Sequence, residues 1–231
     1  LYGARLAPST VVEGLVHWRL HLVVFAGTFV LFPFLGLVIG LIAPTFLPPA
    51  FAMGIMFLCV LPSTIQSSIA FTSIAGGNIP AAICSASASN ILGMFITPLL
   101  VALLVSSQQG EVSLDSMGAI LLQMLLPFMS GQFLQRWIGG WLVRNKTWLG
   151  LFDRSAILMV VYLAFSAAVV SGIWEHISAQ SLAVMVVVDS LLLATVLMIT
   201  TFASRLLDFS REDEITIVFC GSKKSLASGV P

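Results

Sequence analysis

The chain has 231 residues, of which 58% are hydrophobic and only 9% are charged, and its mean hydropathy is +1.06. A soluble domain carries far more charge on its surface, so the composition excludes an ordinary soluble protein and indicates a membrane protein. Ten Lys and Arg residues balance ten Asp and Glu residues. Because the basic residues are scattered along the chain rather than clustered in a patch, nucleic acid is not an expected partner.

Hydrophobic runs long enough to cross a hydrocarbon core of about 30 Å recur along the whole chain. Turn-forming stretches such as Leu47-Pro48-Pro49 and Gly76-Gly77-Asn78 separate these runs. The fold class we expect is therefore all-α, a polytopic membrane protein. The predicted spans are 19–43, 50–76, 79–105, 116–138, 154–172, 179–204 and an incomplete one from 214 to the end.

The distribution of basic residues predicts the orientation in the membrane. Lys and Arg gather at 5–19, 136–154 and 205–211, whereas the loops at 106–115 and 173–178 contain Glu111, Asp115 and Glu175 but no Lys or Arg. By the positive-inside rule the basic loops are cytoplasmic. The spans then alternate without conflict if segment 50–76 crosses once as a long broken helix rather than twice as a hairpin. We expect a multi-pass protein of the inner or plasma membrane, with the lipid bilayer around it.

Two of the apolar segments are interrupted by small polar residues. The interruptions read Ser63-Thr64-Ile65-Gln66-Ser67-Ser68 and Gly221-Ser222-Lys223-Lys224-Ser225. No water satisfies loose backbone groups inside a bilayer, so a helix breaks only where protein or a hydrated cavity takes over its hydrogen bonds. Corresponding breaks in two distant segments are typical of a binding site near the bilayer midplane of a secondary transporter.

Four motifs make this interpretation more specific: Pro62-Ser63-Thr64-Ile65-Gln66-Ser67-Ser68-Ile69-Ala70, the Gly76-Gly77-Asn78 turn, Ile96-Thr97-Pro98-Leu99-Leu100 and Phe219-Cys220-Gly221-Ser222-Lys223-Lys224-Ser225-Leu226. Together they resemble the bile acid:sodium symporter superfamily, in particular its branch seven and bacterial relatives, over essentially the whole chain. The resemblance implies two inverted repeats of five helices. A panel domain would lie beside a core domain in which the broken fourth and ninth helices cross.

On this resemblance the chain runs from the second helix to the first half of the ninth. Because it opens on Leu1 and stops at Pro231, shortly after a polar break, we expect an incomplete membrane protein that lacks the first helix, most of the second and the tenth. The implied divisions are 1–18 for the end of the second helix and the link after it, 19–105 for core helices three to five, 116–172 for panel helices six and seven, and 179–231 for core helix eight and the truncated ninth.

The resemblance also implies a changed ion site. The sodium-dependent branch uses a Ser-Asn pair that falls here on Ser67 and Ser68, and a Glu and a Gln that fall on Phe219 and Lys223. A sodium site needs several oxygen ligands and a compensating negative charge, so the sequence argues against Na⁺, the only cofactor that the resemblance suggests. Our hypothesis is that Lys223 or Lys224 replaces sodium. Transport would be sodium-independent, or coupled to protons if burial lets the lysine lose its proton.

A lysine inside the membrane also bears on the cargo, because burying an ammonium is costly and the usual compensation is an acidic partner or an anionic ligand. The only acid well inside an apolar run is Asp189, which is an ion-pair partner, a proton relay or a group near the interface. Helix N-termini at the breaks favour an anion, and the resemblance implies organic anions such as bile acids or sulfated steroids. The predicted substrate- and ion-binding residues are Gln66, Ser67, Ser68, Ser87, Asn90, Ser222, Lys223, Lys224 and Ser225.

Other interpretations remain open at this stage. Ser and Thr in membrane helices also return hydrogen bonds to the backbone or allow tight packing. A hydrolytic dyad of Ser67 or Ser222 with Lys223 is conceivable, but no Gly-x-Ser-x-Gly elbow is present, and an enzyme is not predicted. A non-transporting regulator or sensor could keep the same fold. Interfacial anchoring is expected for His17 and His21, and burial as small apolar groups for the cysteines.

Overall fold

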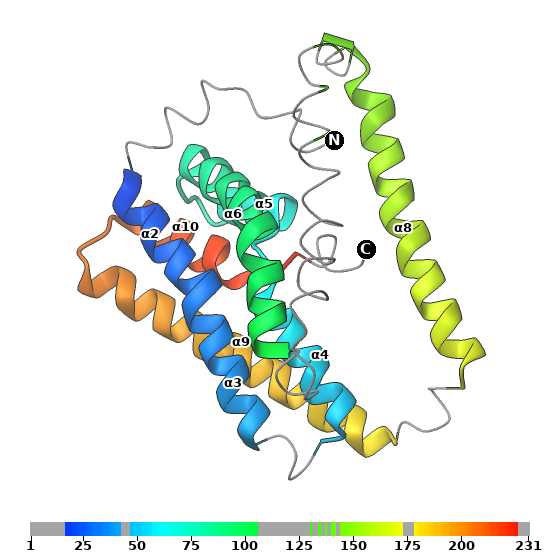
Figure 1. Ribbon diagram of the computed structural model, residues 1–231. Coiled ribbons are helices and arrows are strands. Elements are labelled where there is room, and N and C mark those ends of the chain that lie inside the picture. The colour runs from blue at the N-terminus through cyan, green and yellow to red at the C-terminus, as the bar shows by residue number, and fades with distance from the viewer. Residues whose placement is uncertain are drawn as a thin grey trace.

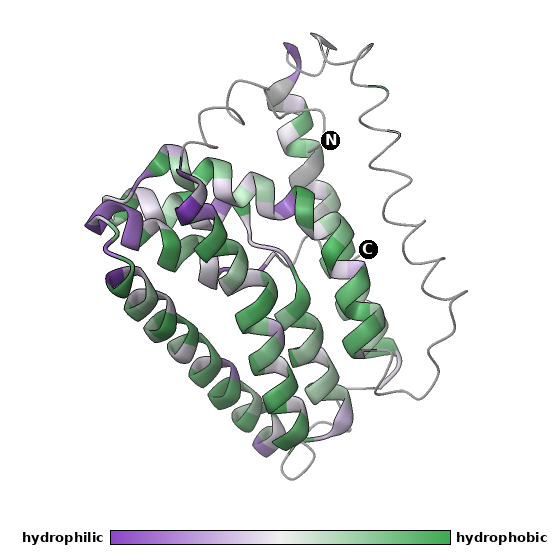
Figure 2. Ribbon diagram, turned by 60° about the vertical axis from the view of Figure 1, so that its left-hand side comes forward, coloured by the Kyte–Doolittle hydropathy of each residue, from purple (hydrophilic) through white to green (hydrophobic). Residues whose placement is uncertain are grey.

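The computed structural model describes residues 17–42, 47–105, 145–172 and 178–225, with scattered positions between 130 and 144. Every regular element in these ranges is a helix, which confirms the all-α prediction. Within the described part of the chain, three helices are long and apolar enough to cross a membrane: Trp18–Ile42, Ile79–Leu104 and Ala179–Leu206. Their residues are predominantly hydrophobic, with hydrophilic residues mostly near the helix ends (Figure 2). The predicted span 116–138 and the loops at 1–16 and 106–115 lie outside the described ranges.

The first span is one continuous run of α2 (Trp18–Ala26), the π-helical turn η3 (Gly27–Leu31) and α3 (Phe32–Ile42), as predicted (Figure 1). The π-turn has a local cause. The Phe32 N–H donates to the Gly27 carbonyl, and Pro33 has no N–H to donate. Neither the α-helical nor the π-helical pattern therefore supplies a donor to the Thr28 carbonyl, which is left for a partner from elsewhere.

The second predicted span is broken. α4 (Pro49–Val60) and α5 (Ile65–Ile74) are separated by residues 61–64, where Leu61 and Thr64 have extended backbone angles. Pro62 lies in this break and cannot donate a helical hydrogen bond, so the helix stops before it. α5 continues away from α4 rather than folding back along it (Figure 1). This course is the one expected of a single broken helix rather than a hairpin.

The third span consists of α6 (Ile79–Leu100) and the π-turn η5 (Val101–Val105), again within the predicted limits. The Asn78 side chain caps α6 by accepting the Ala81 N–H at 3.1 Å. α8 (Lys146–Val170) lies apart from the other helices (Figure 1). The apolar part of α8, Leu158–Val170, lies within the predicted span 154–172, and the helix itself begins earlier, at Lys146.

The last two helices are α9 (Ala179–Leu206) and α10 (Arg211–Ser222). Both begin at a serine cap: Ser178 accepts the Ser181 N–H, and Ser210 accepts the Asp213 N–H. α10 starts three residues before the predicted position and carries Glu212, Asp213 and Glu214 in its first turn, where acidic groups stabilise the positive end of the helix dipole.

α10 lies at the centre of the packing, in contact with α9, α2, α5 and α6. One buried apolar cluster joins α3, α4 and α9, and another joins α2, α6 and α10. The close approach of α3 to α4 depends on a glycine, because a Cβ on Gly36 would lie only 2.9 Å from the Cys59 Cβ. The division into panel and core domains stays a prediction.

Candidate functional site

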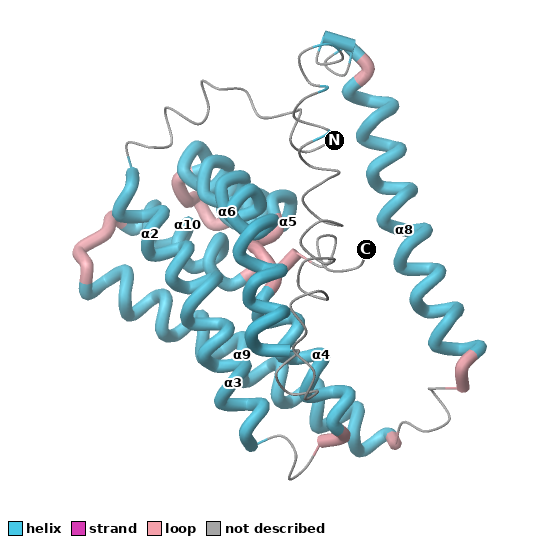
Figure 3. The backbone as a smooth tube through the Cα atoms, viewed as in Figure 1, coloured by secondary structure: helices cyan, strands magenta, loops and turns pink. Residues whose placement is uncertain are grey.

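The two interrupted segments cross at their breaks. Ser63 and Lys224 form an isolated antiparallel β-bridge between the chain after α4 and the chain after α10. The Thr64 N–H donates to the Lys223 carbonyl at 3.3 Å, and the Ser225 N–H donates to the Pro62 carbonyl at 2.8 Å. Figure 3 shows loop segments at the centre of the helices where these residues meet. The two polar clusters singled out in the sequence are therefore neighbours in space.

A helix that ends inside a membrane must find donors for its last carbonyls. At the end of α4 every freed carbonyl from Cys59 to Ser63 has one, and the donors come from outside the helix. The donors are, in chain order, Lys224 for Cys59, Thr97 for Val60, Lys224 for Leu61, Ser225 for Pro62 and Asn90 for Ser63. α6 and the segment after α10 thus supply a donor to each of these five carbonyls.

The end of α10 is satisfied in turn by α5 and the break before it. Ser63 Oγ donates to the Cys220 carbonyl at 2.6 Å, and Ser68 Oγ donates to the Phe219 carbonyl at 3.3 Å. Ser89 Oγ on α6 accepts the Ser63 N–H at 3.1 Å. Sequence reasoning did not select Ser63 and Ser89, although the position of Ser63 directly after Pro62 was a usable signal.

Lys224 places its ammonium among three backbone carbonyls. Lys224 Nζ lies 2.8 Å from the Thr28 oxygen, 2.9 Å from the Cys59 oxygen and 2.8 Å from the Leu61 oxygen. It also lies 4.1 Å from the centroid of the Phe32 ring, a cation–π contact. An ammonium has three N–H donors, so all three are used. Since two of the carbonyls belong to the negative end of α4, the charge also complements the helix dipole.

Lys223 has different surroundings. Its Nζ lies 4.7 Å from the Phe71 ring centroid and 5.8 Å from that of Phe219. The two rings stack with centroids 5.7 Å apart and planes inclined by 20°. No hydrogen bond or ion pair holds the Lys223 ammonium within the described residues. Lys223 is half-buried, and Phe71 is 44% exposed.

Comparison with known proteins places the chain in a family. Residues 1–231 match the SBF-like CPA transporter family. The chain belongs to this family. It is 54% identical to uncharacterized protein PA2026 of Pseudomonas aeruginosa and 51% identical to the Escherichia coli protein named "Putative symporter YfeH", and covers 70% of each. It is 26% identical to sodium/bile acid cotransporter 7 of Rattus norvegicus and covers 68% of it. Each alignment includes 99 to 100% of this chain.

This SBF-like protein is therefore an integral, multi-pass membrane transporter, and the resemblance drawn from its motifs is confirmed. Its long apolar helices agree with that assignment. Within the described residues no hydrogen bond joins Lys223 to Ser67 or Ser222, the residues of the alternative hydrolytic dyad. Ser222 is 4% exposed, and its Oγ has no hydrogen-bond partner in this part of the chain.

The other predicted site residues of the SBF-like chain are placed as follows. Ser68, Asn90, Lys224 and the backbone of Ser225 take part in the crossing. Gln66 is exposed and Ser67 half-buried on α5, and Ser87 is 8% exposed on α6.

Asp189, the predicted ion-pair partner or relay, lies on α9. One of its carboxylate oxygens is buried and has no hydrogen-bond partner among the described residues. No ion pair joins it to Lys223 or Lys224 in this part of the chain, so the relay role stays a prediction.

His21 does not anchor at the interface as predicted. It is 7% exposed, lies 2.5 Å from Ser85 Oγ and stacks on Phe25. Its polar ring is buried because α6 supplies a hydroxyl partner. Cys59 and Cys220 are buried, as predicted, whereas Cys84 is only half-buried.

Proposed function

We propose that this SBF-like protein is a secondary transporter that moves small organic anions by alternating access without sodium. Lys224 would supply the charge that a bound cation supplies in a sodium-coupled relative. The observation that supports this proposal is the coordination of Lys224 Nζ by three backbone carbonyls at 2.8 to 2.9 Å. Carbonyl oxygens at helix ends are the ligands that transporters with broken helices offer to Na⁺ or H⁺.

The surroundings of the crossing oppose a bound sodium ion. The sodium-dependent branch has an acid and an amide where Phe219 and Lys223 stand here. An added Na⁺ would meet repulsion from two ammonium groups and gain no carboxylate in return. We therefore expect transport to be independent of sodium, because Phe219 and Lys223 stand in place of the acid and the amide.

The same charges favour an anionic cargo. Three backbone carbonyls compensate the Lys224 ammonium. The Lys223 ammonium has neither a carboxylate nor a carbonyl partner in the described part of the chain, and an intramembrane ammonium requires compensation. α5 begins at the break with Thr64 as its N-cap, and the Thr64 side chain makes no capping hydrogen bond, so the positive helix end stays available. A relative is named for bile acid transport, and bile acids are organic anions. The cargo would be held at the crossing while the core, 19–105 and 179–231, moves against the panel, 116–172.

Counterflow in proteoliposomes tests this function. The full-length protein is reconstituted with unlabelled naphthalene-2-sulfonate, taurocholate or benzoate inside, and entry of the labelled compound is measured with sodium or potassium as the only cation. We expect exchange at the same rate in both salts. A steep dependence on sodium would overturn the role given to Lys224. Binding without exchange would favour a non-transporting sensor.

A further inference from the structure

We infer that the two adjacent lysines have separate tasks: Lys224 is a fixed structural cation, and Lys223 contacts the anionic group of the cargo. Phe71, Phe219 and Ser67 would complete the cargo subsite. This inference rests on the proposed transport function and specifies which residue recognises the substrate.

The backbone separates the two ammonium groups. Helix α10 ends at Ser222, and Lys223 is extended, with φ of −90° and ψ of 128°. Successive side chains of an extended chain point to opposite sides. The break therefore directs Lys224 toward η3 and the end of α4, and Lys223 toward the aromatic pair on α5 and α10. If α10 had continued as a helix, the two side chains would have been only about 100° apart around the helix axis.

Lys224 cannot recognise cargo without dismantling the crossing. All three of its N–H donors point at carbonyls, and Pro33, at the π-helical partner position of Thr28, has no N–H to donate in its place. An anion that attracted Lys224 would strip these carbonyls of their hydrogen bonds. Its contacts suit a permanent structural role.

The Lys223 ammonium has N–H donors that no acceptor of the described residues uses. It is in contact with two ring faces, which do not replace three hydrogen bonds. Its position after the break puts it near the middle of an interrupted membrane segment, where facing lipid would be costly. We therefore expect the exposed part of the Lys223 side chain to face a hydrated cavity rather than lipid. An anion arriving there would meet a charge that no carboxylate of the described residues neutralises.

The aromatic pair indicates the kind of anion. Phe71 exposes 44% of its surface beside the ammonium, so the charge lies next to a flat apolar surface. Ser67 precedes Phe71 by one helical turn on the same face of α5 and adds a hydroxyl. This combination suits an amphipathic anion in which a carboxylate or sulfonate is attached to a rigid hydrophobic ring system.

Matched ligands and matched variants test the inference on the full-length, detergent-purified protein. Binding of naphthalene-2-sulfonate, taurocholate and the neutral naphthalene-2-sulfonamide is measured by calorimetry for wild type, Lys223→Met and Lys223→Arg. We expect Lys223→Met to weaken both anions by about tenfold or more, as for a lost charge-assisted contact, with little change for the sulfonamide. Lys223→Arg should restore most of the affinity. Phe71→Leu should weaken naphthalene-2-sulfonate while keeping the preference for anion over sulfonamide.

A chemical rescue asks whether position 223 is reached from water. Lys223→Cys in proteoliposomes is treated with the methanethiosulfonate reagent that adds an aminoethyl group, or with the one that adds a sulfonatoethyl group, and treated wild type serves as the control. We expect the amine to restore counterflow and the sulfonate not to. Unchanged anion affinity in Lys223→Met would overturn the inference while leaving transport by wild type intact. If wild type neither binds nor exchanges any of the anions, the proposed function itself fails.

Discussion

A single side chain resolves the hydrogen-bonding deficit at the crossing. Pro33 leaves the Thr28 carbonyl without a helical donor, and the end of α4 at Pro62 frees those of Cys59 and Leu61. Lys224 satisfies all three. Arginine would place the charge on a wider planar group with five donors, and methionine would offer no donor. The site thus matches an ammonium in the number of donors as well as in charge.

Lys224→Met should therefore destabilise the protein strongly. Each buried carbonyl left without a donor costs about 1–3 kcal/mol, offset in part by no longer burying a charge. We expect a net loss of roughly 2–5 kcal/mol. The measurement is the thermal unfolding midpoint of the full-length protein in detergent, with Lys223→Met as the matched control because it removes the same charge one residue away. Equal midpoints for the two variants would contradict the assigned roles.

Ser63 is predicted to matter more than its small size suggests. Its Oγ donates to the Cys220 carbonyl at 2.6 Å and links the two breaks directly. Ser63→Ala should lower stability by about 1–2 kcal/mol, since a buried carbonyl loses its partner. Ser190→Ala on α9 is the control: the Ser190 hydroxyl is exposed and bonds only within its own helix. Its effect should stay within about 0.5 kcal/mol.

At the scale of helices, the approach of α6 to the break depends on the absence of a side chain. A Cβ on Gly93 would lie 2.6 Å from Pro62 Cβ, too close to be accommodated without movement. α6 needs this close approach because Ser89, Asn90 and Thr97 all bond to residues 60–63. Gly93 thus permits the packing that satisfies the end of α4.

Gly93→Ala should destabilise the protein by about 1–3 kcal/mol through overpacking. Gly54→Ala in α4 is the matched control, because a Cβ there meets no atom within 4 Å. That change should stabilise by up to about 1 kcal/mol, since alanine is the better helix former. Thermal unfolding of both variants in one detergent gives the comparison. Equal and small effects would mean that α6 shifts freely away from Pro62.

The sequence was sufficient to predict the broken helix and the partner break after α10, because proline and small polar residues inside apolar runs strongly favour an interruption of the helix. It also predicted Ser68, Asn90 and Lys224 near the crossing. It did not separate Lys223 from Lys224, since that distinction depends on where the helix ends and the extended backbone begins. The carbonyls that bind Lys224 could not be predicted from the sequence, because every residue type has a carbonyl. Only Pro33 and Pro62 indicated which carbonyls lack a helical N–H donor.

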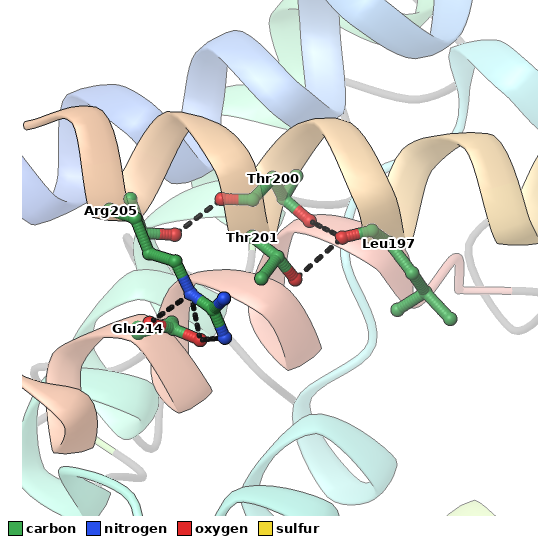
Figure 4. Close-up of polar contacts among 6 residues, drawn as sticks. Leu197, Thr200, Thr201, Arg205 and Glu214 are labelled. Carbon is green, nitrogen blue, oxygen red and sulfur yellow. Dashed lines mark hydrogen bonds and ion pairs between the residues drawn. The ribbon is translucent and has the colours of Figure 1, made fainter.

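At the scale of the whole molecule, an ion pair connects the end of α9 to the first turn of α10, across the short turn between the two helices. Arg205 on α9 makes a bidentate ion pair with Glu214 on α10, with distances of 3.1 to 3.2 Å (Figure 4). The Thr200 and Thr201 hydroxyls both donate to the Leu197 carbonyl of α9 itself (Figure 4). A surface ion pair of this kind contributes about 0–1 kcal/mol to stability. Its main effect here is to fix the position of α10 relative to α9.

If α9 and α10 belong to one core that moves as a unit, then linking them should not slow transport. Arg205→Cys with Glu214→Cys allows a short bifunctional thiol reagent to connect the two positions. We expect counterflow after cross-linking to stay within about twofold of the untreated double variant, because alternating access moves the core against the panel and leaves distances inside the core unchanged. The same reagent on the protein without the added cysteines controls for the native thiols. Loss of exchange on cross-linking, recovered when the link is cleaved, would instead mean that α10 moves against α9 and that the crossing itself is remodelled in each cycle.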